Sequence, residues 1–301
     1  ITAIGGTHIC LRALDPELSF RLMREEGVTH MCAAPTVLIM LANAPADKRG
    51  DVRRGIKVIT AGAPPAAATI QRVEGEFGWE LLHAYGLTET SPFMTVCEPQ
   101  AEHKTRSSKE QATIKAKQGV EIMTAGALRI VDESGHDVPR DGQTLGEIIM
   151  RGNVIMAGYY NDPEATATAM RGGWFHSGDA AVMHPDGYIE IRDRFKDVII
   201  SGGENISSVE VEGVMMQHPS ICEIAVIGVP DEKWGETPRA FVVLNQGTSA
   251  TDKELIAYAR ENLAHFKAPR KIVFVDQLPK TATGKIKKYV LRQGQSSIGK
   301  Q

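Results

Sequence analysis

The residues with the clearest chemical potential are a lysine and a threonine–glutamate pair, which lie in two widely separated loops. Near the C-terminus, the segment Pro279–Lys285 (PKTATGK) is a glycine-bent loop that presents one lysine. Far upstream, the segment Tyr85–Thr90 (YGLTET) is a second loop of small residues. A lysine suits phosphate or a developing negative charge, and Thr88 with Glu89 suits phosphate and a hard metal ion. The two loops predict chemistry on a nucleotide, with groups supplied by distant parts of the chain.

Each loop also has a simpler structural interpretation. Gly284 and Lys285 do not fit a P-loop, because the first glycine of that pattern falls at Pro279 and no serine or threonine follows the lysine. Taken alone, the segment favours a solvated lysine beside a turn. The upstream loop is equally compatible with a strand-to-helix turn capped by a threonine.

A third candidate is Asp179, which ends the segment Gly172–Asp179 (GGWFHSGD). A carboxylate there could accept hydrogen bonds from both hydroxyls of a ribose, and the alternative is a hairpin with an aspartate in its turn. Two histidines lie near these motifs. We expect His176 to be packed or at the surface rather than to act as a base, and we expect His83 to pack rather than to contact a substrate carboxylate.

The segment 193–205 (DRFKDVIISGGEN) joins a charged run to an apolar strand and a glycine pair. It is either an exposed linker followed by a strand and a turn, or a hinge, because hinge motion concentrates at the ends of such elements. Gly202 and Gly203 would let a ligand approach the backbone closely.

The order of apolar segments predicts the fold class. Strands at residues 29–33, 56–60 and 81–84 alternate with helices at 18–26, 35–44 and 66–77, which indicates a parallel sheet with crossover helices. Ligands bind beyond the carboxyl ends of such strands, where Gly62 and Gly86 fall. The polar stretch 98–117 is predicted to be a solvated loop or helix. Short strands and hairpins follow, and from Ser207 onward strands and helices are mixed.

Composition excludes several classes of protein. The chain has 301 residues, 42% hydrophobic and 24% charged, which suits two soluble domains. Its net charge of -3 argues against nucleic-acid binding. No apolar run has membrane-spanning length. The four cysteines are scattered, with no CxxC pair, which favours reduced thiols and a cytoplasmic location. The chain begins at Ile1 with a strand-like segment, so we expect a fragment of a longer protein.

Taken together and in order, these motifs resemble the acyl-adenylate-forming superfamily, which includes acyl-CoA synthetases, the adenylation domains of peptide synthetases and firefly luciferase. The resemblance covers essentially the whole chain, and residues 196–206 (KDVIISGGENI) look most like the fatty-acid and aryl-acid CoA ligase branch. It implies an α/β fold. Residues 1–193 would be the C-terminal part of the large AMP-binding domain, with mixed sheets, helices and a small β-barrel-like part. Residues 194–301 would be a small mobile α+β domain with a hinge at Lys196.

The resemblance also implies a two-step reaction with ATP, Mg²⁺ and CoA. A carboxylic acid attacks the α-phosphate of ATP to give acyl-AMP and pyrophosphate, and the CoA thiol then expels AMP. Lys285 would bridge the carboxylate and the α-phosphate. Thr88 would contact phosphate and Glu89 would bind Mg²⁺. The other nucleotide contacts would come from Gly62, Ala63, Pro64, Tyr85, Gly86, Asp179 and Arg194, and the CoA contacts from Gly202, Gly203, Glu204, Trp234 and Phe266.

The resemblance fails upstream of these motifs and in the segment 119–128, where the family tends to place a proline. The family carries a Ser/Thr/Gly-rich phosphate loop ending in Pro-Lys upstream of these motifs, and this sequence contains no such stretch. We therefore expect a partial acyl-CoA ligase for a medium-chain or aryl acid, whose exposed apolar faces drive association between copies. Two alternatives stay open. The acyl group could pass to a carrier-protein thiol, or the chain could be a non-catalytic module that binds nucleotide or CoA.

Overall fold

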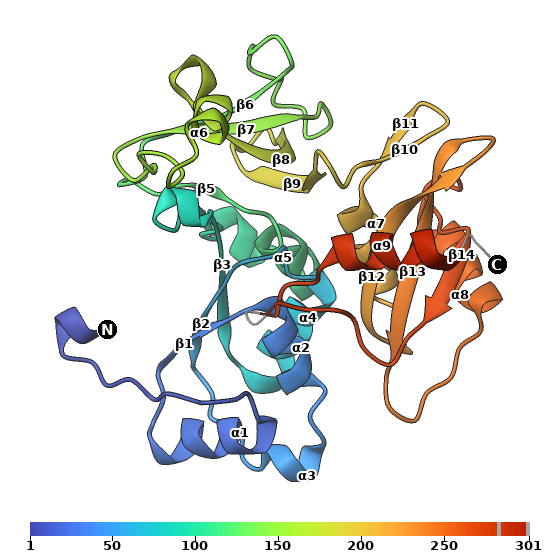
Figure 1. The fold of residues 1–301 in the computed structure, drawn as a ribbon. Helices are drawn as coiled ribbons and strands as arrows, with labels where there is room; N and C mark the ends of the chain where they lie inside the picture. The colour runs from blue at the N-terminus through green and yellow to red at the C-terminus, as the bar shows by residue number, and fades with distance from the viewer. Residues whose placement is uncertain (282–283, 299–301) are drawn as a thin grey trace.

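The computed structural model describes residues 1–281 and 284–298 as three bodies arranged around a central junction (Figure 1). Ala282 and Thr283 of the lysine loop lie outside the described residues. The first body, drawn in blue to teal, contains α1 (Pro16–Glu25), β1 (His30–Ala33), α2 (Pro35–Ala42), α3 (Ala46–Arg49), β2 (Lys57–Thr60), α4 (Ala67–Arg72) and β3 (Glu80–Tyr85). The predicted mixed α/β fold is confirmed.

The predicted parallel sheet is present in the first body. β1 pairs with β2 and β2 with β3, both in parallel, so each crossover carries a helix. The antiparallel strands β4 (Thr95–Val96) and β5 (Val120–Glu121) extend the sheet to five strands in the order β1-β2-β3-β4-β5. The sequence did not reveal these two-residue strands, because so short a segment has no readable period.

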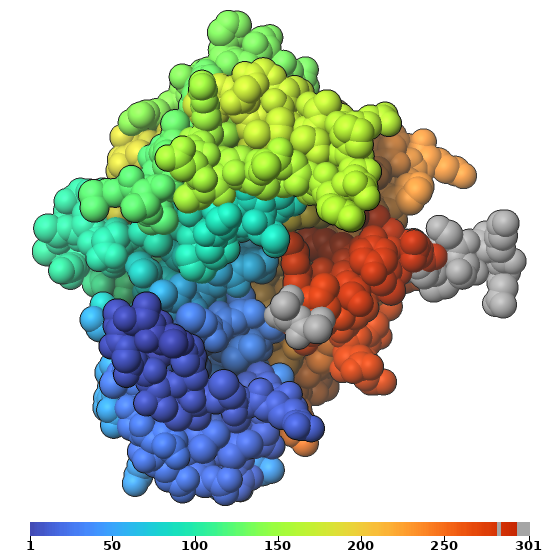
Figure 2. Space-filling view, turned by 60° about the vertical axis from the view of Figure 1, so that its left-hand side comes forward, coloured from blue at the N-terminus to red at the C-terminus, as the bar shows by residue number. Residues whose placement is uncertain are grey.

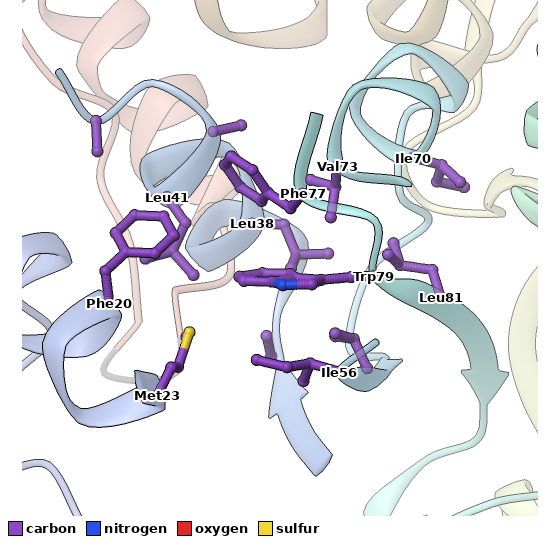
Figure 3. Packing of buried hydrophobic residues seen from close by; sticks show 14 of the residues in the cluster. Phe20, Met23, Leu38, Leu41, Ile56, Ile70, Val73, Phe77, Trp79 and Leu81 are labelled. Carbon is purple, nitrogen blue, oxygen red and sulfur yellow. The ribbon is translucent and has the colours of Figure 1, made fainter. Parts of the chain in front are cut away.

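An aromatic cluster forms the core beneath this sheet (Figure 3). Helix α1 starts at Pro16 with Asp15 as its cap, since the Asp15 carboxylate accepts the Leu18 backbone N–H at 2.7 Å. The helix thereby turns Phe20 inward, where its ring meets that of Phe77 edge-on at a centroid distance of 5.5 Å. Figure 3 shows these rings with Trp79 between α1, α2 and the sheet.

The polar stretch after β4 contains a short 3₁₀ turn (Ala101–Thr105) and helix α5 (Ser108–Lys115). Ser107 and Glu110 cap this helix reciprocally, as a capping box. Of the helix residues only Ala112 is buried, so the prediction of a solvated helix is confirmed.

The second body, drawn in green to yellow, is an antiparallel sheet in the order β6-β7-β8-β9. Its strands are β6 (Ala127–Val131), β7 (Gly146–Arg151), β8 (Phe175–Met183) and β9 (Ile189–Arg194), and helix α6 (Pro163–Ala169) lies between β7 and β8 in sequence. Among the described residues β6 and β9 do not pair, so the expected barrel-like part is an open four-stranded sheet.

The third body, drawn in orange to red, follows the charged segment after β9. Its sheet has the order β11-β10-β13-β12, with β14 beside β13. The elements are β10 (Ile199–Ser201), β11 (Glu204–Ile206), α7 (Ser208–Met215), β12 (Ile221–Asp231), β13 (Gly235–Leu244), α8 (Asp252–Asn262), β14 (Lys271–Phe274) and α9 (Lys288–Ile298). This is the α+β arrangement that the sequence predicted.

Candidate active site at the junction of the three bodies

The carboxyl edge of the parallel sheet brings two of the predicted loops together. Thr60 of β2 lies opposite His83 of β3, so Gly62, just beyond β2, and Tyr85, the last residue of β3, lie at the same end of the sheet. Gly62 has a φ of +91°, which favours glycine. A Cβ on Gly86 would lie 1.9 Å from the Pro92 carbonyl oxygen, so only glycine fits there. Ala63 and Pro64 follow at the same edge and are half-buried.

A buried hydrogen bond ties the Tyr85 loop to Asp179 of the second body. The Tyr85 hydroxyl donates to Asp179 Oδ2 at 2.8 Å, and Arg194 Nε lies 3.3 Å from Asp179 Oδ1. Asp179 is only 5% exposed, and desolvation raises its pKa, although the Tyr85 hydroxyl and Arg194 oppose that shift. Burial and the neighbouring carboxylate raise the pKa of Tyr85 well above its ordinary range. The sequence did not reveal this pair.

The threonine and glutamate of the same loop lie in a short 3₁₀ turn, Thr88–Thr90. Thr88 is exposed and Glu89 is half-buried. Glu89 Oε1 accepts a hydrogen bond from the Tyr159 hydroxyl at 3.0 Å, and the Glu89 backbone oxygen accepts the Met156 N–H at 2.8 Å. The loop is thus fixed by the second body while the Thr88 hydroxyl remains accessible.

Lys285 ends a turn that closes on itself. Gly284 N donates to Thr281 O at 3.0 Å, and Lys285 N donates to the Thr281 hydroxyl at 3.0 Å. Gly284 has a φ of +85°, and a Cβ on it would lie 2.4 Å from the Thr36 hydroxyl oxygen at the start of α2. The turn therefore rests against the first body, and in Figure 2 the red C-terminal segment lies between the blue and the yellow-green parts.

The ammonium of Lys285 interacts electrostatically with Asp179 and Arg194. Although Lys285 as a residue remains exposed, partial desolvation lowers its pKa, and the positive charge of Arg194 lowers it further, while Asp179 raises it. Lys196 acts in the same direction as Arg194. Among residues 1–281 and 284–298, no carboxylate forms an ion pair with Lys285. Asp179 and Lys285, which belong to different bodies, therefore lie close enough to interact electrostatically.

The two histidines have structural surroundings. His83 is buried, and its Nδ1 donates to the Lys117 carbonyl at 2.8 Å; burial lowers its pKa to about 4, so the ring is neutral near pH 7. His176 Nδ1 lies 2.7 Å from Glu147 Oε2, a carboxylate that also binds Arg171 at 2.8 Å. Both histidines are packed, as predicted.

The residues expected to contact CoA lie on the third body and form a separate group. Trp234 packs against Gly202, where a Cβ would lie 2.7 Å from the indole ring, and the Arg270 guanidinium carbon stands 5.3 Å from the ring centroid. Gly203 and Glu204 continue the β10–β11 hairpin, and Phe266 is 45% exposed. In Figure 1 this hairpin projects away from the segment between β14 and α9 that carries Lys285. Among the described residues, no hydrogen bond or ion pair joins these side chains to Asp179.

The sequence also missed two contacts that frame the site. The Thr36 hydroxyl is buried beside Gly284 and has no hydrogen-bond partner among the described residues. Tyr159 supports Glu89 across a long sequence separation. A polar residue at a helix start or after a turn carries no signal of these contacts, because both depend on how the bodies meet.

This arrangement of a parallel-sheet body, an antiparallel body and a small α+β body around one polar junction defines a class. Residues 1–160 match the AMP-binding enzyme family, and residues 210–285 match the AMP-binding enzyme C-terminal domain. The chain belongs to the AMP-binding enzyme family, the group of adenylate-forming enzymes.

Its curated relatives include named CoA ligases. The chain is 47% identical over 303 residues to a 2-methylpropanoate–CoA ligase of Humulus lupulus, a match that covers 99% of this chain and 54% of the relative. It is 47% identical over 290 residues to 4-hydroxybutyrate–CoA ligase 2 of Metallosphaera sedula, covering 96% of this chain and 52% of the relative. The chain thus spans about half the length of the curated relatives it matches.

Solved structures agree with this assignment. An anthranilate CoA ligase in complex with anthranoyl-AMP superposes with a TM-score of 0.84 at 26% identity, covering 96% of this chain and 55% of that one. An amide bond synthetase from Marinactinospora thermotolerans superposes with a TM-score of 0.83 at 33% identity, covering 97% and 57%. Within the described part of the chain, no helix is both long and apolar enough to cross a membrane.

Proposed function

We propose that the protein to which this chain belongs is an AMP-forming acid–CoA ligase. The observation that carries the proposal is the convergence of Asp179, Arg194 and Lys285 beside the Tyr85–Thr90 loop. Together with relatives named as CoA ligases, this convergence supports adenylation of a carboxylic acid followed by transfer to CoA.

The charges at the junction suit attack of a carboxylate on the α-phosphate of ATP. Asp179, held by Tyr85 and Arg194, is a rigid acceptor for two ribose hydroxyls. Lys285 supplies a positive charge for the attacking carboxylate and the α-phosphate, and it approaches from a different body. Displacement at phosphorus depends mainly on positioning and on neutralising charge. Gly62, Ala63, Pro64 and Gly86 lie at the sheet edge, where we expect the adenine to bind.

Glu89 is our candidate ligand for Mg²⁺. Mg²⁺ is commonly bound through one or two carboxylates and the phosphates of the substrate, so a single half-buried carboxylate next to the Thr88 hydroxyl fits it. Among the described residues no cluster of three or more His, Cys, Asp or Glu side chains could hold a metal alone. The ion would therefore arrive with ATP and neutralise its phosphates.

We further propose that Lys196 is the hinge between residues 1–193 and 194–301. Lys285 lies near Asp179, whereas Gly202, Gly203, Glu204, Trp234 and Phe266 lie elsewhere on the third body. Rotation of that body would withdraw Lys285 and bring the β10–β11 hairpin to the junction for the thiol step. The cytoplasmic location and association between copies remain predictions.

The acid is the least constrained part of the proposal. The sequence favours a medium-chain or aryl acid, and the names of two relatives add a small branched acid and a hydroxy acid. The similarity to an amide bond synthetase adds an amine as an alternative acceptor in the second step.

The test is acid-dependent release of pyrophosphate from ATP by the full-length protein, with and without CoA. The panel contains acetate, 2-methylpropanoate, 4-hydroxybutyrate, octanoate, palmitate and benzoate. Pyrophosphate release with matching CoA consumption supports the ligase. Release without CoA consumption points to a carrier-protein thiol or an amine, and no release with any acid contradicts the proposal and favours a non-catalytic nucleotide-binding module.

A further inference from the structure

Two hydrogen bonds bridge the segment in which we place the hinge. The Asp193 carboxylate, at the end of β9, accepts the backbone N–H of Ser208 at 2.6 Å through Oδ2. The Ser207 hydroxyl donates to the Arg192 carbonyl oxygen. Asp193 and Arg192 precede Lys196, whereas Ser207 and Ser208 begin helix α7 beyond it, so both bonds join the two sides of the hinge.

These bonds are shielded from water. Asp193 is 2% exposed, Ser207 9% and Ser208 0%. A hydrogen bond to a charged acceptor in such surroundings is stronger than one at the surface, and leaving the buried carboxylate without its donor is costly. The bonds therefore fix the orientation of α7 relative to the end of β9.

Lys288 connects the same contact to the segment that carries Lys285. Its ammonium contacts the Ser208 hydroxyl and lies 2.8 Å from Glu212 Oε1, with the two side chains of the ion pair 15% and 18% exposed. The negative charge of Asp193 acts on Glu212, so one cation balances two nearby carboxylates. Lys288 is the first residue of α9, three positions after Lys285, and Arg292 of the same helix pairs with Asp197 at 2.6 Å.

We propose that Asp193, Ser207, Ser208 and Lys288 form a latch across the hinge, which stabilises the orientation that places Lys285 beside Asp179 and must open before the second half-reaction. Asp193 and Lys288 are thus positioning residues. Asp193 also accepts the backbone N–H of Arg194 at 2.8 Å, so among the described residues its side chain contacts the nucleotide site only through the backbone of its neighbour, and both residues act through the placement of Lys285. This inference rests on the proposed function and on the hinge at Lys196.

The latch predicts unequal responses of the two half-reactions, which a general loss of stability would not produce. In the full-length protein, Asp193→Ala should slow formation of acyl-AMP about tenfold, the effect of losing a charge-assisted hydrogen bond. Thioester formation from supplied acyl-AMP should be unchanged or faster, because the closed orientation is less populated. Lys288→Met should act in the same direction, and Lys288→Arg should restore the wild-type ratio of the two rates.

A matched control is Lys115→Met. Lys115 forms a comparably shielded ion pair with Glu74 at 2.5 Å, with side chains 13% and 23% exposed, but the pair lies within the first body. This variant should lose stability without changing the ratio of the two rates. If Asp193→Ala and Lys288→Met lower both rates equally, as a destabilised enzyme would, the latch is contradicted.

A second readout needs no activity. Asn43 Nδ2 of the first body lies 3.5 Å from Cys222 Sγ of the third body. With the exposed Cys10 and Cys32 replaced by serine, Asn43→Cys should be linked to Cys222 by a short bis-methanethiosulfonate reagent. Asp193→Ala should reduce the yield of this crosslink, and an unchanged yield would overturn the latch. If the wild type adenylates no acid in the panel, the proposed function fails, while the crosslink still tests the latch.

Discussion

Asp179 and Lys285, two charged groups that interact electrostatically at the junction, are held in very different ways. Asp179 is buried, and the Tyr85 hydroxyl and Arg194 fix both of its oxygens. Lys285 is exposed, lies at the end of a self-closed turn and has no ion-pair partner among the described residues. In the proposed mechanism, Asp179 would belong to the fixed part of the site, whereas Lys285 would be delivered by a separate body. A group needed in only one step can be delivered in this way, whereas a group that holds the nucleotide throughout must stay in place.

The largest expected effect comes from removing the positive charge of Lys285. Lys285→Ala should lower the rate of acyl-AMP formation by about 10²–10³-fold, the range for losing one stabiliser of a charged transition state. Thioester formation from supplied acyl-AMP should be nearly unchanged, because the lysine acts only in the first step. Single-turnover assays of the two half-reactions measure this, and equal losses in both would refute the role.

The next largest effect should come from restricting the rotation of residues 194–301 that brings Lys285 to the site. Lys196→Pro fixes the φ angle of residue 196 and should trap one orientation of residues 194–301. One half-reaction should persist while the other falls by about 10²-fold, since a small misplacement of a catalytic group already costs that much. The same pair of assays provides the measurement, with Phe195→Leu, a change at the exposed neighbour, as the control. Normal rates in both half-reactions would show that the hinge lies elsewhere.

A smaller effect should follow from removing one of the hydrogen bonds that hold Asp179. Tyr85→Phe keeps the ring but removes the hydroxyl that binds Asp179, leaving a buried carboxylate with one partner fewer. The KM for ATP should rise about tenfold, the effect of one lost hydrogen bond to a charged group. Because the nucleotide stays bound in both steps, both half-reactions should suffer alike, in contrast to Lys285→Ala. A loss confined to the first step would contradict the assignment of Asp179 to the fixed part.

The smallest effect on chemistry concerns His83, which supports the fixed side from within the sheet. Its pKa is about 4 in the folded chain against 6.5 ordinarily, so the unfolded chain binds more protons between these values. The contribution of neutral His83 to the free energy of unfolding should therefore be complete above pH 6.5. It should fall by about 3 kcal/mol as the pH drops towards 4. Urea unfolding at pH 7.5 and 4.5 measures this, and His83→Gln should lack that part of the pH dependence. Identical pH dependence in both proteins would argue against a buried neutral ring.

The sequence predicted the strands of the first body better than the elements of the third body, which carries Lys285. The strands at 29–33, 56–60 and 81–84 were readable because buried parallel strands leave apolar runs bounded by turns. Helix α9 and strand β11 were not predicted, since α9 has a glycine and two serines within its span and β11 has only three residues. The loops with Thr88, Asp179 and Lys285 were recognised as motifs.

The contacts between distant segments could not be predicted. The Tyr85–Asp179 hydrogen bond joins residues 94 positions apart, and the approach of Gly284 to Thr36 depends on how two bodies meet. Local patterns describe which residues share a strand or a helix face, but they carry no information on the packing of separate bodies. The family roles of the individual site residues remain predictions that the variants above test.

The apolar clusters of the molecule have a consequence for its cooperativity. Among the described residues, one cluster includes Phe20 and Trp79, a second Met94 and Phe175, and a third Ile199 and Leu255, and the clusters share no member. The third body thus has a core of its own, whereas Met94 of the first body packs with Phe175 of the second, so we expect residues 194–301 to melt in a separate calorimetric transition. The hydrogen bonds from the third body to the other two join polar groups, such as Ser208 with Asp193 and Cys222 with Asn43. Such a boundary can be remade in every catalytic cycle without exposing a hydrophobic core to water.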